Sequence, residues 1–197
     1  MASAAAEARL ALMDRPKRPA TYADIEALQP NEIGEILGGI LHVHPRPALP
    51  HAHAASVLGG ELGPPFHRGR GGPGGWILLD EPELHLVEDV LVPDLAGWRR
   101  ERMPEVPKTS FTTLAPNWAC EVLSSSTEAT DRAAKIPIYA RERVDHVWLI
   151  DPIVQTLEVY RLDGETYRLL MTLCGDATAR VEPFDAIELE LAALWVR

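Results

Sequence analysis

A single acidic residue inside an apolar run constrains this chain more than any other feature of its sequence. Glu121 lies in TLAPNWACEVL (113–123), whose mostly apolar composition predicts a strand near the middle of a sheet. Alternate side chains of a strand share a face, so Glu121 shares one with Ala119 and Leu123. A carboxylate in such a strand is costly unless something compensates its charge. The chain must therefore build a sheet and bring a compensating group to Glu121.

A second acidic residue, Asp94, follows Pro93 in VLVPDLAGW (90–98). Proline cannot donate to a sheet ladder, so Pro93 indicates a bulge or an edge that turns Asp94 out of regular pairing. A magnesium ion held by Asp94 and Glu121 would supply the missing charge, with water and phosphate as its other ligands. Alternatively, Asp94 ends a strand and Glu121 forms a buried ion pair with an arginine. Spacing alone leaves the two interpretations equal.

The order of predicted elements indicates an α/β (α+β) fold, a mixed β-sheet flanked by helices. Thr21 can cap a short first helix, and Gly38-Gly39 is a strong hairpin signal between two apolar runs. The glycines and prolines of GPPFHRGRGGPGG predict a mobile loop. The other predicted elements are a helix over 51–62, consecutive strands within 76–98, a helix from about 127 to 141, strands over 146–151, 156–162 and 167–173, and a strand-like or helical tail over 184–195.

Length and charge limit the domain organisation and the partners. The 197 residues suit one domain, which we place at 21–197 behind a flexible N-terminal leader, 1–20. The leader carries charges where a signal peptide needs an unbroken apolar stretch, and no run is long enough for a membrane helix, so we expect a cytoplasmic protein. The net charge of −10 argues against a broad basic surface for nucleic acid. It does not exclude a nuclease, because a bound metal attracts phosphate.

Two further groups of residues are candidates for binding. His42, His44, His51 and His53 lie close together in sequence and could hold zinc or iron, although intervening prolines make their convergence uncertain. The basic segments HRGR (67–70) and RRER (99–102) could contact a nucleic-acid backbone or form solvated surface; the second interpretation is the more common one. Spacing alone does not assign a binding function to the histidines or to the basic segments.

One long segment resembles a known family. The stretch EVLSSSTEATDRAAKIPIYARERVDHVWLIDP (121–152) is similar to the signature of the Uma-type restriction-endonuclease-like family, which has the PD-(D/E)XK nuclease fold. VPDLAGW, EILGGIL and PALPHAHAASVL are similar to three further motifs of the family, in the same order. The resemblance covers roughly residues 20–195. It implies a restriction-endonuclease-like domain that hydrolyses nucleic acid, with DNA as the expected substrate.

The resemblance also implies roles for individual residues. Asp94 and Glu121 would bind Mg²⁺ or Mn²⁺, and Glu35 of the hairpin would lie near the metal. Leu123 stands where the parent pattern has lysine, so Lys135 on the following helix becomes the candidate for that role. Pro137 should kink this helix, which puts the aim of Lys135 in question. A binding protein of the same fold without catalysis is the second hypothesis, the histidine metalloprotein is the third, and a homodimer is left open.

Overall fold

The computed structural model describes residues 18–196, so most of the expected leader lies outside the described residues. A six-stranded sheet forms the centre of the molecule, and its strand order is β11-β10-β9-β8-β6-β3. Strand β8, which carries Glu121, lies inside this sheet and pairs parallel to β9 and antiparallel to β6. The strands are β3 (Trp76–Asp80), β6 (Leu95–Arg99), β8 (Trp118–Val122), β9 (His146–Asp151), β10 (Thr156–Asp163) and β11 (Thr166–Cys174).

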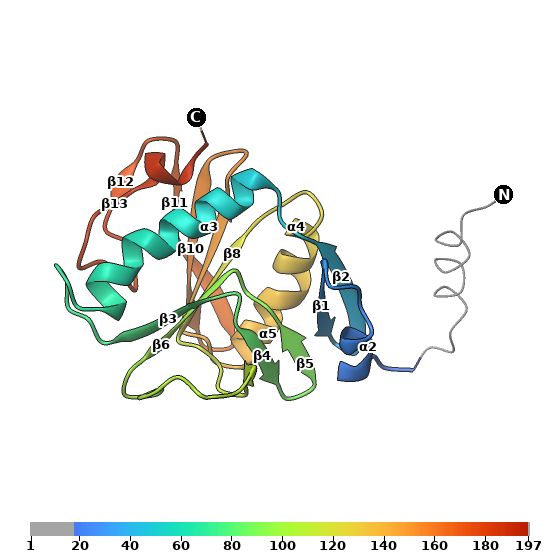
Figure 1. Ribbon diagram of the computed structural model, residues 1–197. Coiled ribbons are helices and arrows are strands. Elements are labelled where there is room, and N and C mark those ends of the chain that lie inside the picture. Colours follow the sequence, from blue (N-terminus) through green and yellow to red (C-terminus); the bar gives the residue numbers. More distant parts are fainter. Residues whose placement is uncertain (1–17, 197) are drawn as a thin grey trace.

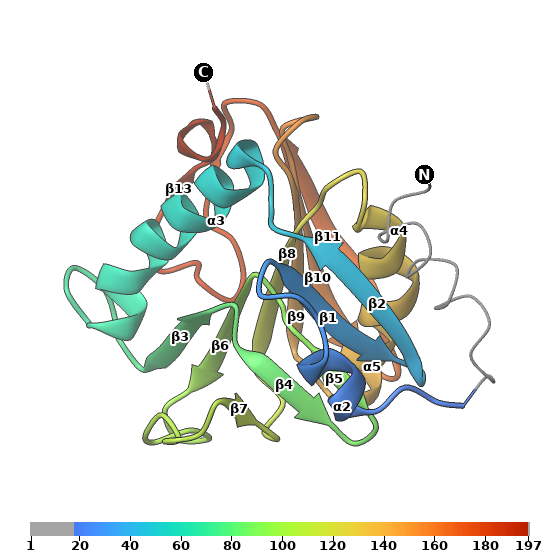
Figure 2. The same ribbon diagram turned by 45° about the vertical axis from the view of Figure 1, so that its right-hand side comes forward.

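A second, five-stranded sheet stands beside the first, with the order β2-β1-β5-β4-β7 (Figures 1 and 2). The sequence predicts one mixed sheet, and the structure divides its strands between these two sheets and a short ribbon of β12 and β13. The hairpin at Gly38-Gly39 forms β1 and β2 as predicted. The strands are β1 (Glu32–Leu37), β2 (Ile40–Pro45), β4 (Glu83–Leu86), β5 (Asp89–Leu91), β7 (Phe111–Thr112), β12 (Thr178–Ala179) and β13 (Leu189–Glu190).

Helices cover both faces of the six-stranded sheet (Figure 1). On one face α3 buries Leu58 and Leu62 against Trp118 and Trp148. On the other face α5 packs Tyr139 with residues of β6, β8 and β9. No helix within residues 18–196 is long and apolar enough to cross a membrane. The helical segments are α2 (Tyr22–Glu26), α3 (Leu49–Leu62), η1 (Gly63–His67), α4 (Glu128–Thr130), η2 (Asp131–Lys135), α5 (Ile136–Arg141) and η3 (Leu191–Leu194).

The helical stretch that follows β8 changes its hydrogen-bond pattern just before Pro137. It consists of α4, η2 and α5 in succession, and η2 is a wider π-helical turn in which the Ile136 N–H bonds to the Asp131 carbonyl. Pro137 then stands in the first turn of α5, where a missing N–H is tolerated. The departure from regular α-helical bonding thus lies at the position where the sequence predicts a kink. Such turns are frequent at functional sites.

Backbone contacts close the glycine-rich segment that follows η1, for which the sequence predicts a mobile loop. The Arg70 N–H donates to the Pro64 carbonyl and the Gly74 N–H to the Pro65 carbonyl, both at 2.8 Å. A Cβ atom added to Gly72 would lie only 2.4 Å from the Cβ of Pro65. The segment is a loop, as predicted, and its glycines permit this close packing. Its mobility stays a prediction.

Candidate active site

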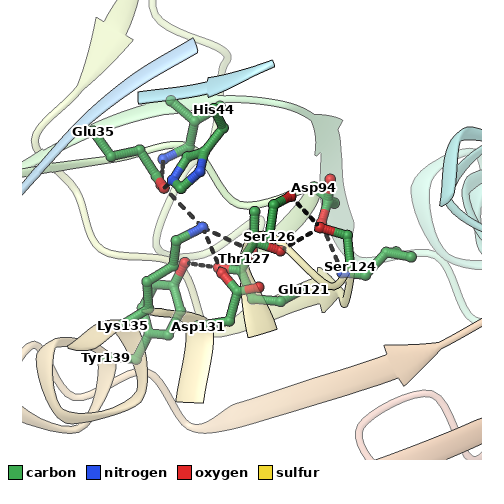
Figure 3. A network of polar contacts seen from close by, with 12 residues as sticks. Glu35, His44, Asp94, Glu121, Ser124, Ser126, Thr127, Asp131, Lys135 and Tyr139 are labelled. Atoms are coloured by element: carbon green, nitrogen blue, oxygen red, sulfur yellow. Dashed lines mark hydrogen bonds and ion pairs between the residues drawn. The ribbon is translucent and has the colours of Figure 1, made fainter. Parts of the chain in front are cut away.

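Three carboxylates from three separate elements surround the ammonium of Lys135 (Figure 3). The Lys135 Nζ lies 3.0 Å from Glu35 Oε1 on β1, 3.1 Å from Glu121 Oε2 on β8 and 3.2 Å from Asp131 Oδ1 on its own helix. All four side chains are at most 5% exposed. Burial lowers the pKa of Lys135, but the carboxylates outweigh it and raise this pKa well above the usual value. The lysine is therefore held as a cation.

Glu121 is the most strongly desolvated carboxylate of this group. Burial raises its pKa well above the ordinary value; Lys135 opposes this shift, while Asp131 and Asp94 add to it. Both carboxylate oxygens accept hydrogen bonds, Oε2 from Lys135 at 3.1 Å and Oε1 from the Tyr139 hydroxyl at 2.5 Å. These two bonds hold the Glu121 side chain in one orientation, although burial makes its negative charge unfavourable.

Asp94 lies next to Glu121 and outside the regular sheet ladder. It directly precedes β6, whose first residue, Leu95, pairs with Cys120 of β8. Its Oδ2 accepts a hydrogen bond from the Val122 N–H at 2.7 Å, and its Oδ1 lies 3.1 Å from His51 Nε2. Pro93 has the effect that the sequence predicts, because Asp94 stands in the bend between β5 and β6.

A cavity of about 220 Å³ opens onto this group of residues. The hydroxyls of Ser124, Ser126 and Thr127 line another part of its wall, where Ser124 Oγ lies 2.9 Å from Ser126 Oγ and 3.0 Å from Thr127 Oγ1. The structure thus brings together every candidate site residue that the family resemblance implies, and Asp131 in addition. The acidic and basic residues of the wall include Glu35, Asp94, Glu121, Asp131 and Lys135.

The balance of charge in this cavity favours a further cation. Five carboxylates and two permanently basic side chains, Lys135 and Arg46, line the cavity, and the three buried carboxylates around Lys135 share its one positive charge. Among residues 18–196, no three histidine, cysteine, aspartate or glutamate side chains come together as a ready-made metal-binding group. Mg²⁺ needs only one or two protein carboxylates, with water and phosphate completing its shell. The oxygen donors of Asp94 and Glu121, on adjacent strands and one cavity wall, fit that requirement.

Sequence reasoning missed three contributors to the site. The expectations from sequence give no role to Asp131 or Tyr139, and they include His51 only as one of four clustered histidines. The spacing of four residues between Asp131, Lys135 and Tyr139 places them on one helical face, which was a usable signal. For His51 no such signal exists, because its partner Asp94 is 43 residues away in sequence. Although burial opposes it, the hydrogen bond to Asp94 raises the pKa of His51.

The histidines predicted as a rival metal site do not converge. His44 Nε2 lies 3.4 Å from Glu35, whereas His51 contacts Asp94 and His53 Nε2 lies 3.3 Å from the Ala193 carbonyl. The rings of His42 and His44 lie with their centroids 6.5 Å apart on β2. The four histidines are thus divided among different partners, and prolines between the two pairs let the chain turn before α3 begins.

Comparisons with known proteins agree with this architecture. The family model Uma2, described as a putative restriction endonuclease, matches residues 19–193. The crystal structure of a putative nuclease belonging to DUF820 from Anabaena variabilis ATCC 29413 superposes with a TM-score of 0.71. That protein is 22% identical in sequence, and the match covers 89% of this chain and 97% of the other. The likeness shows a shared fold. None of the curated proteins matches this chain.

Proposed function

This chain belongs to the Uma2 family of putative restriction endonucleases, and from that premise we propose that it is a metal-dependent endonuclease that hydrolyses phosphodiester bonds of DNA. One observation carries the proposal: a single cavity is lined by the buried Lys135 together with Glu35 of β1, Asp94 before β6, Glu121 of β8 and Asp131 of η2. Structural ion pairs do not need an opening to solvent, whereas a hydrolytic site does. A cluster of desolvated ionisable groups at the wall of a cavity is typical of an active site.

Asp94 and Glu121 are the residues that would hold the ion. When bound, Mg²⁺ or Mn²⁺ supplies an activated water and stabilises the charge of the phosphate. Lys135 keeps its positive charge in the cavity wall, where its ammonium can attract a phosphate oxygen. Glu35 accepts hydrogen bonds from the Val92 N–H at 2.7 Å and from Lys135, so it fixes the lysine against the hairpin. Its role is to position Lys135.

A binding protein of the same fold without catalysis is the second candidate. It is favoured by the bonds that already engage the oxygens of the two metal-binding candidates. Asp94 accepts from Val122 and lies beside His51, and Glu121 accepts from Lys135 and Tyr139. A cluster satisfied by its own protein could persist for stability alone. The two candidates differ in the effect of metal: the nuclease needs it to cleave DNA, whereas the binding protein binds equally well without it.

The decisive experiment measures cleavage of DNA by the purified protein with Mg²⁺ or Mn²⁺ and with EDTA. We expect slow cleavage with metal, none with EDTA and none with Glu121→Gln, which keeps the shape but removes a charge from the ion's ligands. Glu182→Gln is the matched control, because Glu182 pairs with Arg161 at 3.0 Å and does not line the cavity. Cleavage by Glu121→Gln at the parent's rate, or cleavage in EDTA, would overturn the nuclease proposal. DNA binding that is indifferent to metal, without cleavage, would favour the binding protein.

A further inference from the structure

Two basic segments that are far apart in the sequence lie side by side at the end of α3. The Arg100 N–H donates to the Gly75 carbonyl at 2.9 Å, and the Arg100 Nη2 lies 3.3 Å from the His67 carbonyl. The guanidinium of Arg99 lies over the ring of Trp76, 4.2 Å from its centroid. Figure 1 shows the loop after α3 at the same end of the molecule as β3 and β6. The fold thus joins the segments 67–70 and 99–102 into one surface.

This surface carries five arginines and one acidic residue, the exposed Glu101, so it is basic on balance. Its five arginines are all exposed, and within residues 18–196 none of them forms an ion pair with a carboxylate. By contrast, Arg132 and Arg141 are each paired with acidic residues. In a chain of net charge −10, five neighbouring arginine side chains without ion pairs differ from the overall acidic character. We call it the arginine face, and it consists of Arg68, Arg70, Arg99, Arg100 and Arg102.

A cavity of about 570 Å³ leads from the arginine face to the candidate active site. His67 and Arg68 line one part of it, and His51 and Asp94 line another. Between them the wall is the face of α3 that carries only small side chains, Ala52, Ala55, Ser56 and Gly59. Asp94 also lines the smaller cavity that contains Glu121 and Lys135. The two cavities therefore meet at Asp94.

The charge of the larger cavity changes along its length. Its acidic residues gather at the inner end: Asp80 pairs with Leu95 in the sheet, and the Glu81 N–H donates to the Asp94 carbonyl at 3.0 Å. Its arginine, Arg68, is at the outer end with His67, whereas His51 at the inner end lies against Asp94. A polyanion is attracted to the outer end and repelled from the inner end unless a cation binds there. This distribution suits a substrate that carries several phosphates and reaches the carboxylates only together with metal.

We infer that the arginine face binds backbone phosphates of the DNA, several nucleotides away from the phosphate that reaches Asp94. The inference rests on the proposed function and adds the surface by which the substrate is held. The 14 residues of α3 span about 21 Å at 1.5 Å per residue, or about six nucleotides at 3.4 Å each. Phosphate contacts of this kind fix the register of the duplex and carry no sequence information.

Binding to a fluorescently labelled duplex of about 20 base pairs, longer than the estimated span, tests the inference. The measurements use the full chain with Glu121→Gln and Ca²⁺, so that the duplex stays intact. Two double variants, R68Q/R70Q and R100Q/R102Q, remove arginines of the face while Arg99 keeps its contact with Trp76. The control, R168Q/R180Q, removes two exposed arginines that lie elsewhere in the sequence, on and after β11. We expect each test variant to bind at least tenfold more weakly than the control.

The salt dependence gives a second, independent readout. Each lost phosphate contact should reduce the slope of log affinity against log salt by about 0.9, hence by about 1.8 for each double variant. Hydrolysis of bis(4-nitrophenyl) phosphate, a small diester that cannot span the cavity, should stay unchanged when these substitutions are made in the active parent chain. Test variants that bind DNA like the control would overturn the inference and leave the nuclease proposal standing. Equal displacement of DNA by poly-glutamate would assign the face to an acidic protein instead.

The nuclease proposal fails by a different result. If the parent chain and Glu121→Gln hydrolyse both the small diester and DNA at the same rate, the carboxylate site is not catalytic. The binding data of the arginine variants do not enter that comparison. The two failures can therefore be told apart within one set of proteins.

Discussion

At the scale of single residues, the chemistry of this protein centres on the ammonium of Lys135, which lies within 3.2 Å of three carboxylates. Burial of so many charges is tolerated only because each has a partner. The lysine therefore has a structural role in addition to the proposed catalytic one. The two roles can be separated by comparing substitutions at the lysine and at its acidic neighbours.

Replacement of Lys135 by methionine should lower stability and activity together. It leaves Glu35, Glu121 and Asp131 without their common cation, and breaking a buried pair in this way costs about 3–5 kcal/mol. We also expect cleavage to fall by at least about a hundredfold, the scale of a lost electrostatic contact to phosphate. Urea unfolding and single-turnover cleavage measure the two effects. A variant as stable as the parent would show that the carboxylates were protonated and did not need the lysine.

Asp131→Asn tests whether that carboxylate positions Lys135. The substitution keeps an acceptor but removes a charge beside the ammonium, and such supporting contacts are worth roughly 10- to 100-fold in activity. We expect kcat to fall with little change in KM, because Asp131 positions the lysine and does not hold the substrate. Glu128→Gln, three residues earlier on an exposed part of the helix, is the matched control and should cleave normally. A fall in activity of equal size in both variants would contradict the positioning role.

The sequence reveals the acidic candidates better than the residues that support them. Glu121 stands out because a carboxylate in an apolar strand needs compensation, and Asp94 because Pro93 precedes it. The spacing of Tyr139 from Lys135 is visible in the sequence, but the contact of His51 with Asp94 depends on how separate elements pack, which one-dimensional periodicity does not encode. Lys135 was found only through the family resemblance, since its helix spacing fits an ordinary surface pair equally well.

At the scale of elements, the hairpin of β1 and β2 brings Glu35 to the site and is fastened by Asp89. This buried carboxylate accepts hydrogen bonds from the Gly38 N–H and from Arg141 Nη2, both at 2.6 Å. It thereby ties the hairpin turn to the end of α5. Within the described residues, the sheet pairing of β1 with β5 consists of the single residue pair Ile36 and Val90. Side-chain links therefore hold the hairpin in place, through Asp89 at its turn and through Glu35, which accepts from the Val92 N–H and from Lys135.

Asp89→Ala should loosen the hairpin without unfolding the central sheet. It removes two hydrogen bonds and leaves the Gly38 N–H unsatisfied, at a cost of about 1–3 kcal/mol, while the partly exposed Arg141 keeps its contact with Glu142. We expect faster amide hydrogen exchange in β1 and β2, lower activity, and unchanged protection in β8. Asp163→Ala, at the exposed turn between β10 and β11, is the control. Equal exchange in both variants would show that the hairpin is held by other contacts.

Element boundaries were more predictable than the assignment of strands to sheets. The hairpin, α3 and the strands within 76–98 all form close to their predicted positions. The division into two sheets occurs where β3 passes to β4 and β5 passes to β6. Glu81 adopts a φ of 44° at the first of these bends, and Pro93 interrupts the ladder at the second. Pro93 signals a bulge or an edge, but no local pattern states that the chain changes sheets there.

At the scale of the whole molecule, the phenolic side chains offer a test of packing that does not depend on metal or DNA. The chain has four tyrosines, and in all four the folded protein raises the pKa above the ordinary value of 10. Burial raises the pKa of Tyr160 to about 12, with a contribution from the hydrogen bond to Glu158. Burial likewise raises the pKa of Tyr139 and Tyr167, whereas the bond to Glu83 is the main cause for Tyr22.

These shifts predict how stability changes in alkali. A group whose pKa is raised in the folded state binds its proton more tightly there than in the unfolded chain. Its stabilising contribution is complete below the unfolded pKa of about 10 and is lost as the pH rises through the folded value.

The native protein should therefore show almost no phenolate absorbance at pH 10, whereas about half of the tyrosines should be ionised at that pH in guanidinium chloride. Above pH 10, ionisation and unfolding should occur together, so phenolate absorbance and circular dichroism should change with one midpoint. Tyr160→Phe should remove part of the signal near pH 12 if the fold persists to that pH. Half-ionised tyrosines at pH 10 without denaturant would contradict the close packing around Tyr139, Tyr160 and Tyr167 on one face of the central sheet.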